Sequence, residues 1–595
     1  MGASPSEDGP SPALRGGGIG AGPHGGFLTR LRERPGAAVT CWALIALLGA
    51  MLVLPVGLAL ARGFVHRGQF SLYWFSRLLR DDTPRFVLNG LLLATLTTLL
   101  CLVIAVPLAL LRARCRFFGQ GLLSVAVLVP LILPPFVGAM AMKQILGQFG
   151  TLNLLLAKVG ILDPTDMRTA PDWMAGRLFV LAILQALHLF PILYLNAAAA
   201  LANVDPAHAQ AARNLGAGPI RTFFRVTLPL MRPGLFAGGT IVFIWAFTDI
   251  GTPVMLDYKP LVPVRIFDDL RTANYGGKTF ATVVTLLALS VLFYVVGKFL
   301  FGRSAGAQSS KATVQSETRR LGPMGALGAW AAFGFVLVLA ILPHVGVVLQ
   351  AVADHWINTA FPTTYTADHL HAVIRDSETY ASILNSLRYA GCSTALNILL
   401  GTLAAWLIVR SRAVGSRMLD ALAMLPLAVP GLILAAGYVA LTVPGSWLQA
   451  VGPGRNPFAI LVLAYTARRM PFIVRGVAGG LQQAPESLEE AARNLGASRT
   501  RTAFSITLPL IAANIIAGGV LVFAFAMLEV SDSLVLAQLA EHYPITKQIY
   551  ILATGSPETQ SLAAALGVYG MALLGGTMAL ASLLLGRRLG TVFRA

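Results

Sequence analysis

The chain has 595 residues, of which 56% are hydrophobic and only 12% are charged. Soluble globular domains carry roughly 25% charged residues. The low charge and the mean hydropathy of +0.71 therefore exclude an ordinary soluble protein and favour a membrane protein. The formal net charge of +19 does not indicate a nucleic-acid partner, because the basic residues stand in short clusters between apolar runs.

Taken in chain order, residues 1–37 are rich in Gly, Pro and Ser and predict a disordered cytoplasmic leader. The next run, from Ala38 to Ala61, is too long for the apolar core of a signal peptide and long enough to cross a bilayer. Comparable runs recur to the end of the chain. They predict about twelve transmembrane helices, near residues 38–61, 87–111, 121–146, 178–201, 234–256, 280–301, 325–350, 384–409, 418–442, 457–478, 514–538 and 562–586.

Only helices and closed barrels satisfy all backbone polar groups inside lipid. These runs are too long and too uniformly apolar for the alternating strands of a barrel. The sequence therefore predicts an all-α polytopic membrane protein. Tight arginine clusters, such as Arg112 to Arg116 and Arg410 to Arg417, fall on the N-terminal side of the membrane. Positive charge gathers on the cytoplasmic side, so we expect both termini in the cytoplasm.

The chain contains an internal repeat. Residues 205–239 align with residues 485–519 at a constant offset of 280, and 17 of the 35 aligned positions are identical. Further upstream the offset is 296, which pairs Asn89 with Asn385. Six helices return the chain to the same side, so the two copies should be parallel repeats. The sequence predicts a first unit at 38–303, a cytoplasmic linker at 304–322 and a second unit at 323–595.

The best-preserved block of the repeat lies in a predicted cytoplasmic loop between the fourth and fifth helices of each unit. In the second copy, acidic residues precede Ala491 and Ala492, and Gly496 follows. Acids at the start and a glycine after the end are typical of a short helix. A chain re-entry at Leu508-Pro509 comes next. The pattern predicts a compact exposed helix offered to a partner, although an ordinary connector preserved after a gene duplication would look similar.

This block resembles the EAA loop in the permeases of binding-protein-dependent ABC importers. The matching residues are Glu490, Ala491, Ala492 and Gly496 in the second copy, and Gln210, Ala211, Ala212 and Gly216 in the first. The resemblance implies that residues 205–218 and 485–498 each dock one ATP-binding cassette ATPase subunit. Gln210 departs from the pattern, because glutamate is usual at that position.

Two such loops on one chain look like the fused permeases of type I importers. That group imports ferric iron, thiamine or 2-aminoethylphosphonate. The resemblance implies a multi-pass permease of the cell inner membrane that receives ferric iron from a periplasmic or lipid-anchored substrate-binding protein. Thiamine, 2-aminoethylphosphonate and polyamine are the alternative cargoes.

The chain lacks the phosphate-binding loop that ATP hydrolysis requires; the nearest match, Gly277-Lys278-Thr279, has Thr272 where the first glycine should stand. No catalytic or metal-binding spacing is present in the sequence. We therefore expect a transport subunit that is not an enzyme and binds no cofactor, with ATP bound by partner subunits.

Three carboxylates fall inside or beside predicted fifth helices: Asp249, Glu529 and Asp532. Asp249 and Glu529 are related by the repeat offset. Carboxylates within a membrane are costly and usually face a cavity or a partner, so they are candidates for a translocation path lined by both units. Alternatively, they cap short helices near Gly251 and Ser533. His188 has Arg468 at its repeat position and is interpreted as a satisfied core or pore histidine.

Proline-rich stretches at 128–138 and 424–434 should interrupt helices, which in transporters marks a point where a path opens. Packing kinks are the alternative. The main competing function is a secondary transporter driven by an ion gradient. That class needs no ATPase partner, and it does not explain why the best-preserved repeat is cytoplasmic.

Overall fold

The computed structural model describes residues 35–163, 167–174, 178–301, 318–411 and 413–585. The predicted leader up to residue 34 and linker residues 304–317 lie outside the described residues. Within them the chain is almost wholly helical, with three short two-stranded ribbons. The strands are β1 (Val65–His66), β2 (Gln69–Phe70), β3 (Cys115–Arg116), β4 (Arg319–Arg320), β5 (Ala353–His355) and β6 (Thr364–Tyr365).

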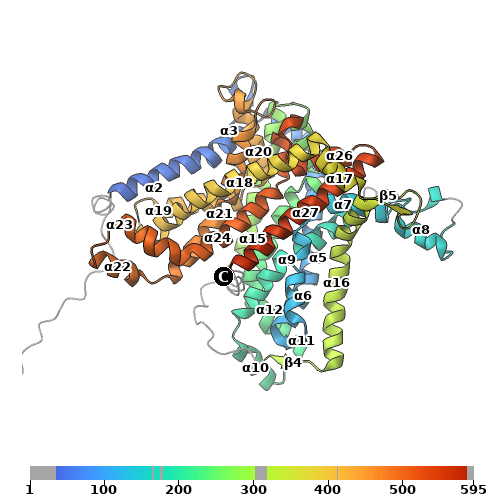
Figure 1. Cartoon of the computed structure of the whole chain (residues 1–595), viewed down its shortest axis with the longest axis horizontal. Helices are drawn as coiled ribbons and strands as arrows, with labels where there is room; N and C mark the ends of the chain where they lie inside the picture. Colours follow the sequence, from blue (N-terminus) through green and yellow to red (C-terminus); the bar gives the residue numbers. More distant parts are fainter. Residues whose placement is uncertain (1–34, 164–166, 175–177, 302–317, 412, 586–595) are drawn as a thin grey trace, which may run out of the picture.

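The first unit (unit 1) contains the elements up to α15, which run through Figure 1 from blue to green. Its helices are α2 (Pro35–Leu48), η1 (Gly49–Val53), α3 (Leu54–Gly63), α4 (Tyr73–Arg80), α5 (Thr83–Arg114), α6 (Gln120–Ala126), η2 (Val129–Leu131), α7 (Pro135–Leu146), α8 (Thr151–Lys158), η3 (Met167–Thr169), α9 (Leu178–Ala202), α10 (Pro206–Asn214), α11 (Pro219–Thr222), η4 (Phe223–Thr227), α12 (Leu228–Thr248), α13 (Gly251–Met255), α14 (Val262–Arg271) and α15 (Gly277–Phe301).

The second unit (unit 2) repeats this order of elements, from yellow-green to red in Figure 1. Its helices are α16 (Pro323–Val352), α17 (Asp368–Arg375), α18 (Ser377–Trp406), η6 (Leu407–Ser411), α19 (Ser416–Met424), η7 (Leu425–Leu427), α20 (Gly431–Thr442), η8 (Gln449–Val451), α21 (Phe458–Gln483), α22 (Glu486–Asn494), α23 (Arg499–Thr502), η9 (Ala503–Thr507), α24 (Leu508–Met527), α25 (Ser531–Leu536), η10 (Ala540–His542), α26 (Ile545–Ala553) and α27 (Pro557–Leu585). The match of α5 to α18, α9 to α21 and α12 to α24 agrees with two parallel repeats.

Eight helices among the described residues are long and apolar enough to cross a membrane, or up to ten if two bent pairs each count as one span. The bent pairs lie at the predicted proline-rich stretches, with bends of 91° in unit 1 and 104° in unit 2. The other two predicted spans correspond to α21 and α27. Helix α21 falls outside the apolar set because it carries Arg468, Arg469 and Arg475.

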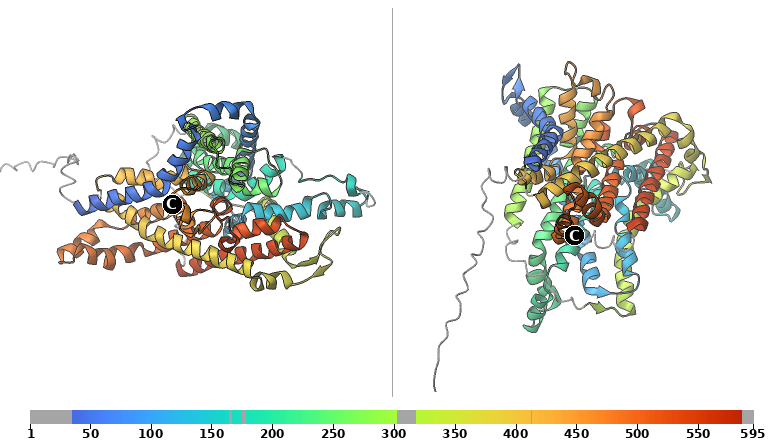
Figure 2. Two further views of the ribbon diagram at one scale, coloured as in Figure 1. Left: turned by 90° about the horizontal axis from the view of Figure 1, so that it is seen from above. Right: turned by 60° about the vertical axis from the view of Figure 1, so that its left-hand side comes forward.

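The two units exchange contacts through their first helices. α3 packs against α15 of its own unit and against α20 of unit 2, and α16 packs against α27 of its own unit and against α7 of unit 1. Figures 1 and 2 show the blue first helix lying along the yellow and orange helices of unit 2. At the contact of α3 with α20 a Cβ on Gly437 would lie 2.6 Å from the Pro55 backbone, so only glycine permits this approach.

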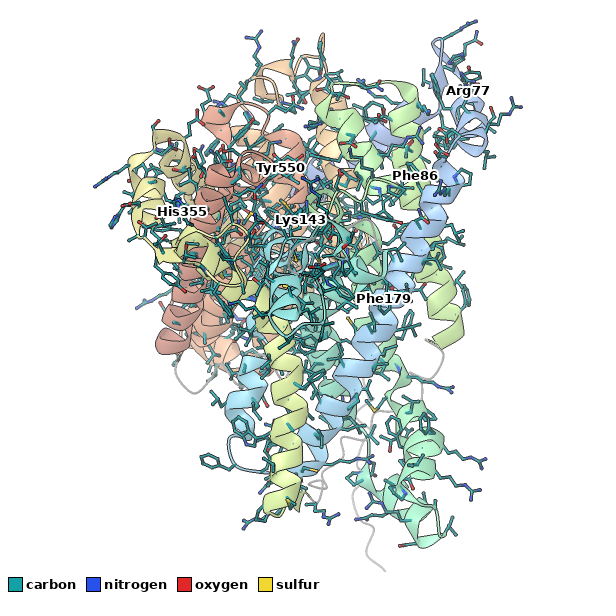
Figure 3. The ribbon with its side chains drawn as sticks, turned by 90° about the vertical axis from the view of Figure 1, so that its right-hand side faces the viewer. Arg77, Phe86, Lys143, Phe179, His355 and Tyr550 are labelled. Atoms are coloured by element: carbon teal, nitrogen blue, oxygen red, sulfur yellow. The ribbon has the colours of Figure 1, made fainter. Side chains whose placement is uncertain are left out.

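A hydrogen bond fixes the same contact. Pro55 has no N–H to give to the carbonyl of Met51, one turn earlier in the helix. The Tyr438 hydroxyl donates to that carbonyl at 2.8 Å instead. The exchange joins the apolar interior of the two units into one continuous core. Figure 3 shows Tyr550 near the middle of the molecule, where its ring meets Phe267 of unit 1 at a centroid distance of 5.9 Å.

Candidate functional site: two loop helices and two helix breaks

The loop helices α10 and α22 are the predicted docking segments, and they have the same shape. Neither has a buried residue. Both end at a glycine in the left-handed region, Gly216 with φ +79° and Gly496 with φ +86°. After each glycine the next N–H returns to the helix at 3.0 Å, from Ala217 to the Ala212 carbonyl in α10. This is the closing hydrogen bond of a glycine-terminated helix.

The predicted docking residues lie on the open side of these helices. Gln210 and Glu490 are exposed at equivalent positions, Ala211 and Ala491 are exposed, and Ala212 and Ala492 are half-buried. The leucine before each glycine, Leu215 or Leu495, has 89% of its surface exposed. Each loop therefore presents a protruding apolar side chain that this chain itself leaves uncovered.

The attachment of the two loop helices differs. In unit 2 the Arg410 guanidinium, only 7% exposed, lies 3.1 Å from both Glu486 and Glu489 and donates to the Ala484 carbonyl at 2.7 Å. Three acceptors at the start of α22 thus converge on one arginine. The sequence pattern did not reveal this clamp, although an arginine at the end of α18 and acids at the start of α22 were both visible.

In unit 1 the equivalent arginine has another partner. Arg114 donates to the Thr227 hydroxyl at 2.7 Å. Pro206 and Ala209 stand where Glu486 and Glu489 stand in unit 2, so α10 offers no carboxylate to this arginine. The first turn of α10 is instead capped by Asp205, which accepts from the Ala207 N–H at 2.9 Å.

The fifth helix of each unit is broken beside a predicted pathway carboxylate. In unit 1, α12 ends at Thr248 and α13 begins at Gly251. The Asp249 carboxylate accepts from the Gly251 N–H at 3.1 Å and the Thr252 N–H at 3.3 Å, and from the Gln185 amide at 3.0 Å. Asp249 therefore caps α13, as the alternative interpretation of the sequence expected.

In unit 2 the break lies between the end of α24 at Met527 and the start of α25 at Ser531. Glu529 caps α25, because it accepts from the Asp532 N–H at 3.1 Å. It is also ion-paired with two arginines of α21. Arg468 lies 2.6 Å from Glu529, and Arg469 contacts its other oxygen. Arg468 is also 3.4 Å from Asp532, which is fully buried. Both carboxylates of this unit are thus engaged by cations.

The two breaks meet near the centre of the molecule. A Cβ placed on Gly251 would lie 3.1 Å from Phe136 and 3.3 Å from Val530. Gly251 follows the unit 1 break and Val530 belongs to the unit 2 break, so the predicted pathway segments of the two units touch. Asp249 lies just before Gly251 in the chain, and Glu529 and Asp532 lie on either side of Val530. All three predicted pathway carboxylates therefore lie close to this contact between the units.

Two asparagines that the repeat pairs make equivalent hydrogen bonds in the two units. Asn89 donates to the Pro260 carbonyl at 3.1 Å, and Asn385 donates to the carbonyls of Glu541 at 2.8 Å and Tyr543 at 3.2 Å. Each ties the segment that follows the broken helix back to α5 or α18. The sequence predicts that the two asparagines are paired by the repeat, but it does not predict these hydrogen bonds. The predicted satisfied histidine, His188, lies 2.9 Å from the Pro130 carbonyl.

A charge cluster lies at the N-terminal end of α5. Asp81 pairs with Arg265 at 2.8 Å and with Lys278 at 2.9 Å. Burial acts to raise the pKa of Asp81, but hydrogen bonds from Thr83, Lys278 and Arg265 outweigh it and hold this pKa well below its ordinary value. Figure 3 shows Phe86, whose ring lies under the Arg265 guanidinium, near the upper edge of the same helix.

Residues 102–306 and 397–593 match the family of binding-protein-dependent transport system inner membrane components. The chain belongs to this family. One match falls in each unit, so the chain is a fused permease of the ABC importer class and a multi-pass membrane protein. It is 25% identical over 460 residues to a ferric transport system permease of Actinobacillus pleuropneumoniae. It is 31% identical over 228 residues to the molybdenum transport system permease of Escherichia coli.

The extent of these matches differs. The alignment with the Actinobacillus permease covers 75% of this chain and 64% of that protein. A putative ferric transport permease of Haemophilus influenzae is also 25% identical, over 75% of this chain and 69% of its own length. The Escherichia coli permease matches only 38% of this chain, although 95% of its own length is covered. The ferric relatives thus align across both units.

Proposed function

We propose that this chain is the membrane channel of an ATP-driven importer, which takes ferric iron from an external binding protein and delivers it to the cytoplasm. Both termini would lie in the cytoplasm, and ATP would be hydrolysed by two separate ATPase subunits docked on α10 and α22. The observation that carries this proposal is the pair of loop helices, which are alike in shape, exposed and glycine-terminated.

The loop helices support docking because each offers an unmet apolar side chain beside a rigid helix end. Exposed apolar side chains on a fixed scaffold are typical of protein interfaces. Both loops follow the fourth helix and precede the fifth helix of their unit, so a movement of either loop acts directly on a broken fifth helix. This connection supports the transfer of an ATPase motion to the pathway.

The cargo is proposed from the relatives. Two ferric permeases align across both units, whereas a spermidine/putrescine permease of Haemophilus influenzae aligns over 32% of this chain. Among the described residues, no three His, Cys, Asp or Glu side chains are grouped to hold a metal ion. We therefore propose that the iron is recognised by the external binding protein. Molybdate, 2-aminoethylphosphonate, thiamine and polyamine are the cargoes to test against it.

The decisive experiment is affinity purification of the chain from its native membrane, followed by mass spectrometry of the proteins that accompany it. A co-purifying ATPase with a phosphate-binding loop is expected. Uptake of labelled ferric iron, molybdate, phosphonate, thiamine and polyamine would then be compared in cells with and without the chain. A chain that purifies alone and moves solute in liposomes under an ion gradient would overturn the proposal in favour of a secondary transporter.

A further inference from the structure

The two breaks are held to their fourth helices by very different contacts. Among the described residues, the one hydrogen bond from α9 to the unit 1 break is that from Gln185 to Asp249, at 3.0 Å. Position 189 of α9 is a leucine, and His188 bonds the Pro130 carbonyl and not the break. One neutral amide therefore holds the unit 1 break to α9.

In unit 2 the equivalent positions of α21 carry Tyr465, Arg468 and Arg469. Arg469 donates to the Phe525 carbonyl in the last turn of α24 at 2.7 Å and pairs with Glu529. Arg468 pairs with Glu529 and, at the start of α25, with Asp532. The arginines thus join the helix before the break, the break itself and the helix after it.

Further side chains form hydrogen bonds to the unit 2 break and to α25. The Tyr465 hydroxyl lies 2.6 Å from the Ser533 hydroxyl. Ser533 and Thr546 both donate to the Glu529 carbonyl at 2.6 Å. At the far end of α25, Lys547 donates to the Leu534 carbonyl at 2.9 Å. Unit 1 has Pro253 at the position of Ser533. Because α14 begins at Val262 and α26 at Ile545, Pro263 and Val264 stand where Thr546 and Lys547 stand, so none of these positions carries a side-chain donor in unit 1.

We propose that the arginine–carboxylate network of α21, α24 and α25 is a latch that fixes the unit 2 break, so the transport cycle opens the path by moving the unit 1 break. Arg468 and Arg469 are positioning residues in this scheme. The Arg469 and Glu529 side chains are 6% and 4% exposed. Separating a buried ion pair leaves charges without partners in apolar surroundings, which is strongly unfavourable.

Among the described residues, no ion pair holds the unit 1 break to α9. Its carboxylate keeps its bonds to the Gly251 and Thr252 N–H groups if α13 moves with it. Of the hydrogen bonds of this carboxylate only the one from Gln185 must then break, and α13 must leave its packing against α7. Gly251 also lies against Val530 of the unit 2 break, close enough that an added Cβ would be 3.3 Å from it. A movement of α13 away from Val530 would therefore separate the two breaks at this point, while α25 stays in place.

Hydrogen exchange, measured by mass spectrometry on the full chain with the partner subunits it retains, tests the latch. We expect the amides of 531–536 to exchange at least about tenfold more slowly than those of 251–255, because exchange reports local opening. Equal exchange in the two segments, or slower exchange in unit 1, would overturn the proposal.

The matched variant is the double substitution Arg469→Leu/Glu529→Gln. The first change installs the leucine that unit 1 has at this position. The second removes the carboxylate charge that the loss of Arg469 would otherwise leave unpaired. Exchange of 531–536 should then rise several-fold toward the level of 251–255, although the contacts of Asp532, Ser533 and Leu534 remain. Asp354→Asn, which removes the exposed ion pair with His355 in the β5–β6 ribbon, should leave both segments unchanged. If the double variant does not fold, the wild-type comparison still decides.

The inference rests on the proposed role of the breaks as pathway walls, but its test does not require transport. Unequal exchange in a chain that imports nothing would leave the latch standing and overturn the proposed function. Equal exchange in a chain that imports iron would do the reverse.

Discussion

Units 1 and 2 share an order of elements and differ in how firmly charge holds their moving parts. In unit 2, Arg410 clamps the loop helix α22 and the two arginines of α21 hold the break. In unit 1, α10 has no carboxylate for Arg114, and the break depends on Gln185. The same order of helices therefore carries a loop helix and a break held by ion pairs in unit 2, and a loop helix and a break held by neutral partners in unit 1. Duplicated units can thus keep their backbone geometry while their side chains come to hold it in different ways.

The largest effect is expected at the shared feature of both loops. Gly496→Asp forces a side chain into a left-handed conformation and adds a negative charge at the negative end of a helix, which together cost about 2 kcal/mol. We expect uptake to fall by more than about tenfold while membrane insertion is retained. Uptake of labelled cargo and immunoblotting of membranes measure the two quantities.

The matched control is Gly445→Asp, because Gly445 has φ +85° in a predicted external loop. The same backbone strain there should leave uptake close to wild type. Normal uptake in Gly496→Asp would contradict docking at α22. Gly216→Asp, measured in parallel, reports whether the looser loop is equally sensitive.

A second variant tests the difference in how the two loop helices are attached. Arg410→Gln removes the cation that holds Glu486 and Glu489, and a lost charged hydrogen bond costs about 1.5–3 kcal/mol. The proportion of chain that retains its ATPase on purification should drop about threefold or more. Arg114→Gln should have a smaller effect, since the hydrogen-bond partner of Arg114 in the described part of the chain is a hydroxyl. An equal loss in both variants would show that the clamp does not distinguish the units.

Asp249→Asn sharpens the comparison at the breaks. Asparagine is also a good helix cap, so the substitution removes charge and keeps the capping bonds. If Asp249 also faces the cargo, uptake should fall severalfold with ATPase association unchanged. Uptake equal to wild type would assign Asp249 to capping alone. Uptake and co-purification are measured on the same cell batch.

The smallest effect is expected at the charge cluster before α5 in unit 1. The pKa of Asp81 is lowered in the folded chain, so its contribution to stability is present above the ordinary pKa, about 4, and is lost as the pH falls below it. A paired carboxylate of this kind contributes about 1 kcal/mol at most. Asp81→Asn should lower the unfolding temperature in detergent near pH 7, and this difference should shrink toward pH 3. A constant difference across this range would contradict the ion-pair assignment.

The repeat and the loop helices were predictable because they depend on local order. Gly496 and the residues before it specify a helix end without reference to anything distant. The Arg410 clamp and the Arg468 pairs escaped prediction, because they join residues far apart in the chain, such as Arg410 and Glu486. A signal was nevertheless present, since two adjacent arginines inside a predicted span require acidic partners in the membrane.

The contacts exchanged by the first helices were beyond the sequence for another reason. A first helix can pack on its own unit alone or can also reach the other unit. Hydrophobic patterning identifies α3 and α16 as spans in either arrangement. The structure shows both helices reaching the other unit, and at α3 the close fit of Gly437 to Pro55 and the Tyr438 hydrogen bond fix this contact.

That exchange has a consequence for biogenesis. α3 is among the first segments to leave the ribosome, but the surface that receives it, α20, is made only after the whole of unit 1. α3 also packs against α15 of its own unit, so the nascent first half can hold this helix on one side while its face toward α20 stays in lipid. The arrival of the second half completes the surroundings of α3, where Ala59, Phe280 and Ala440 are buried together.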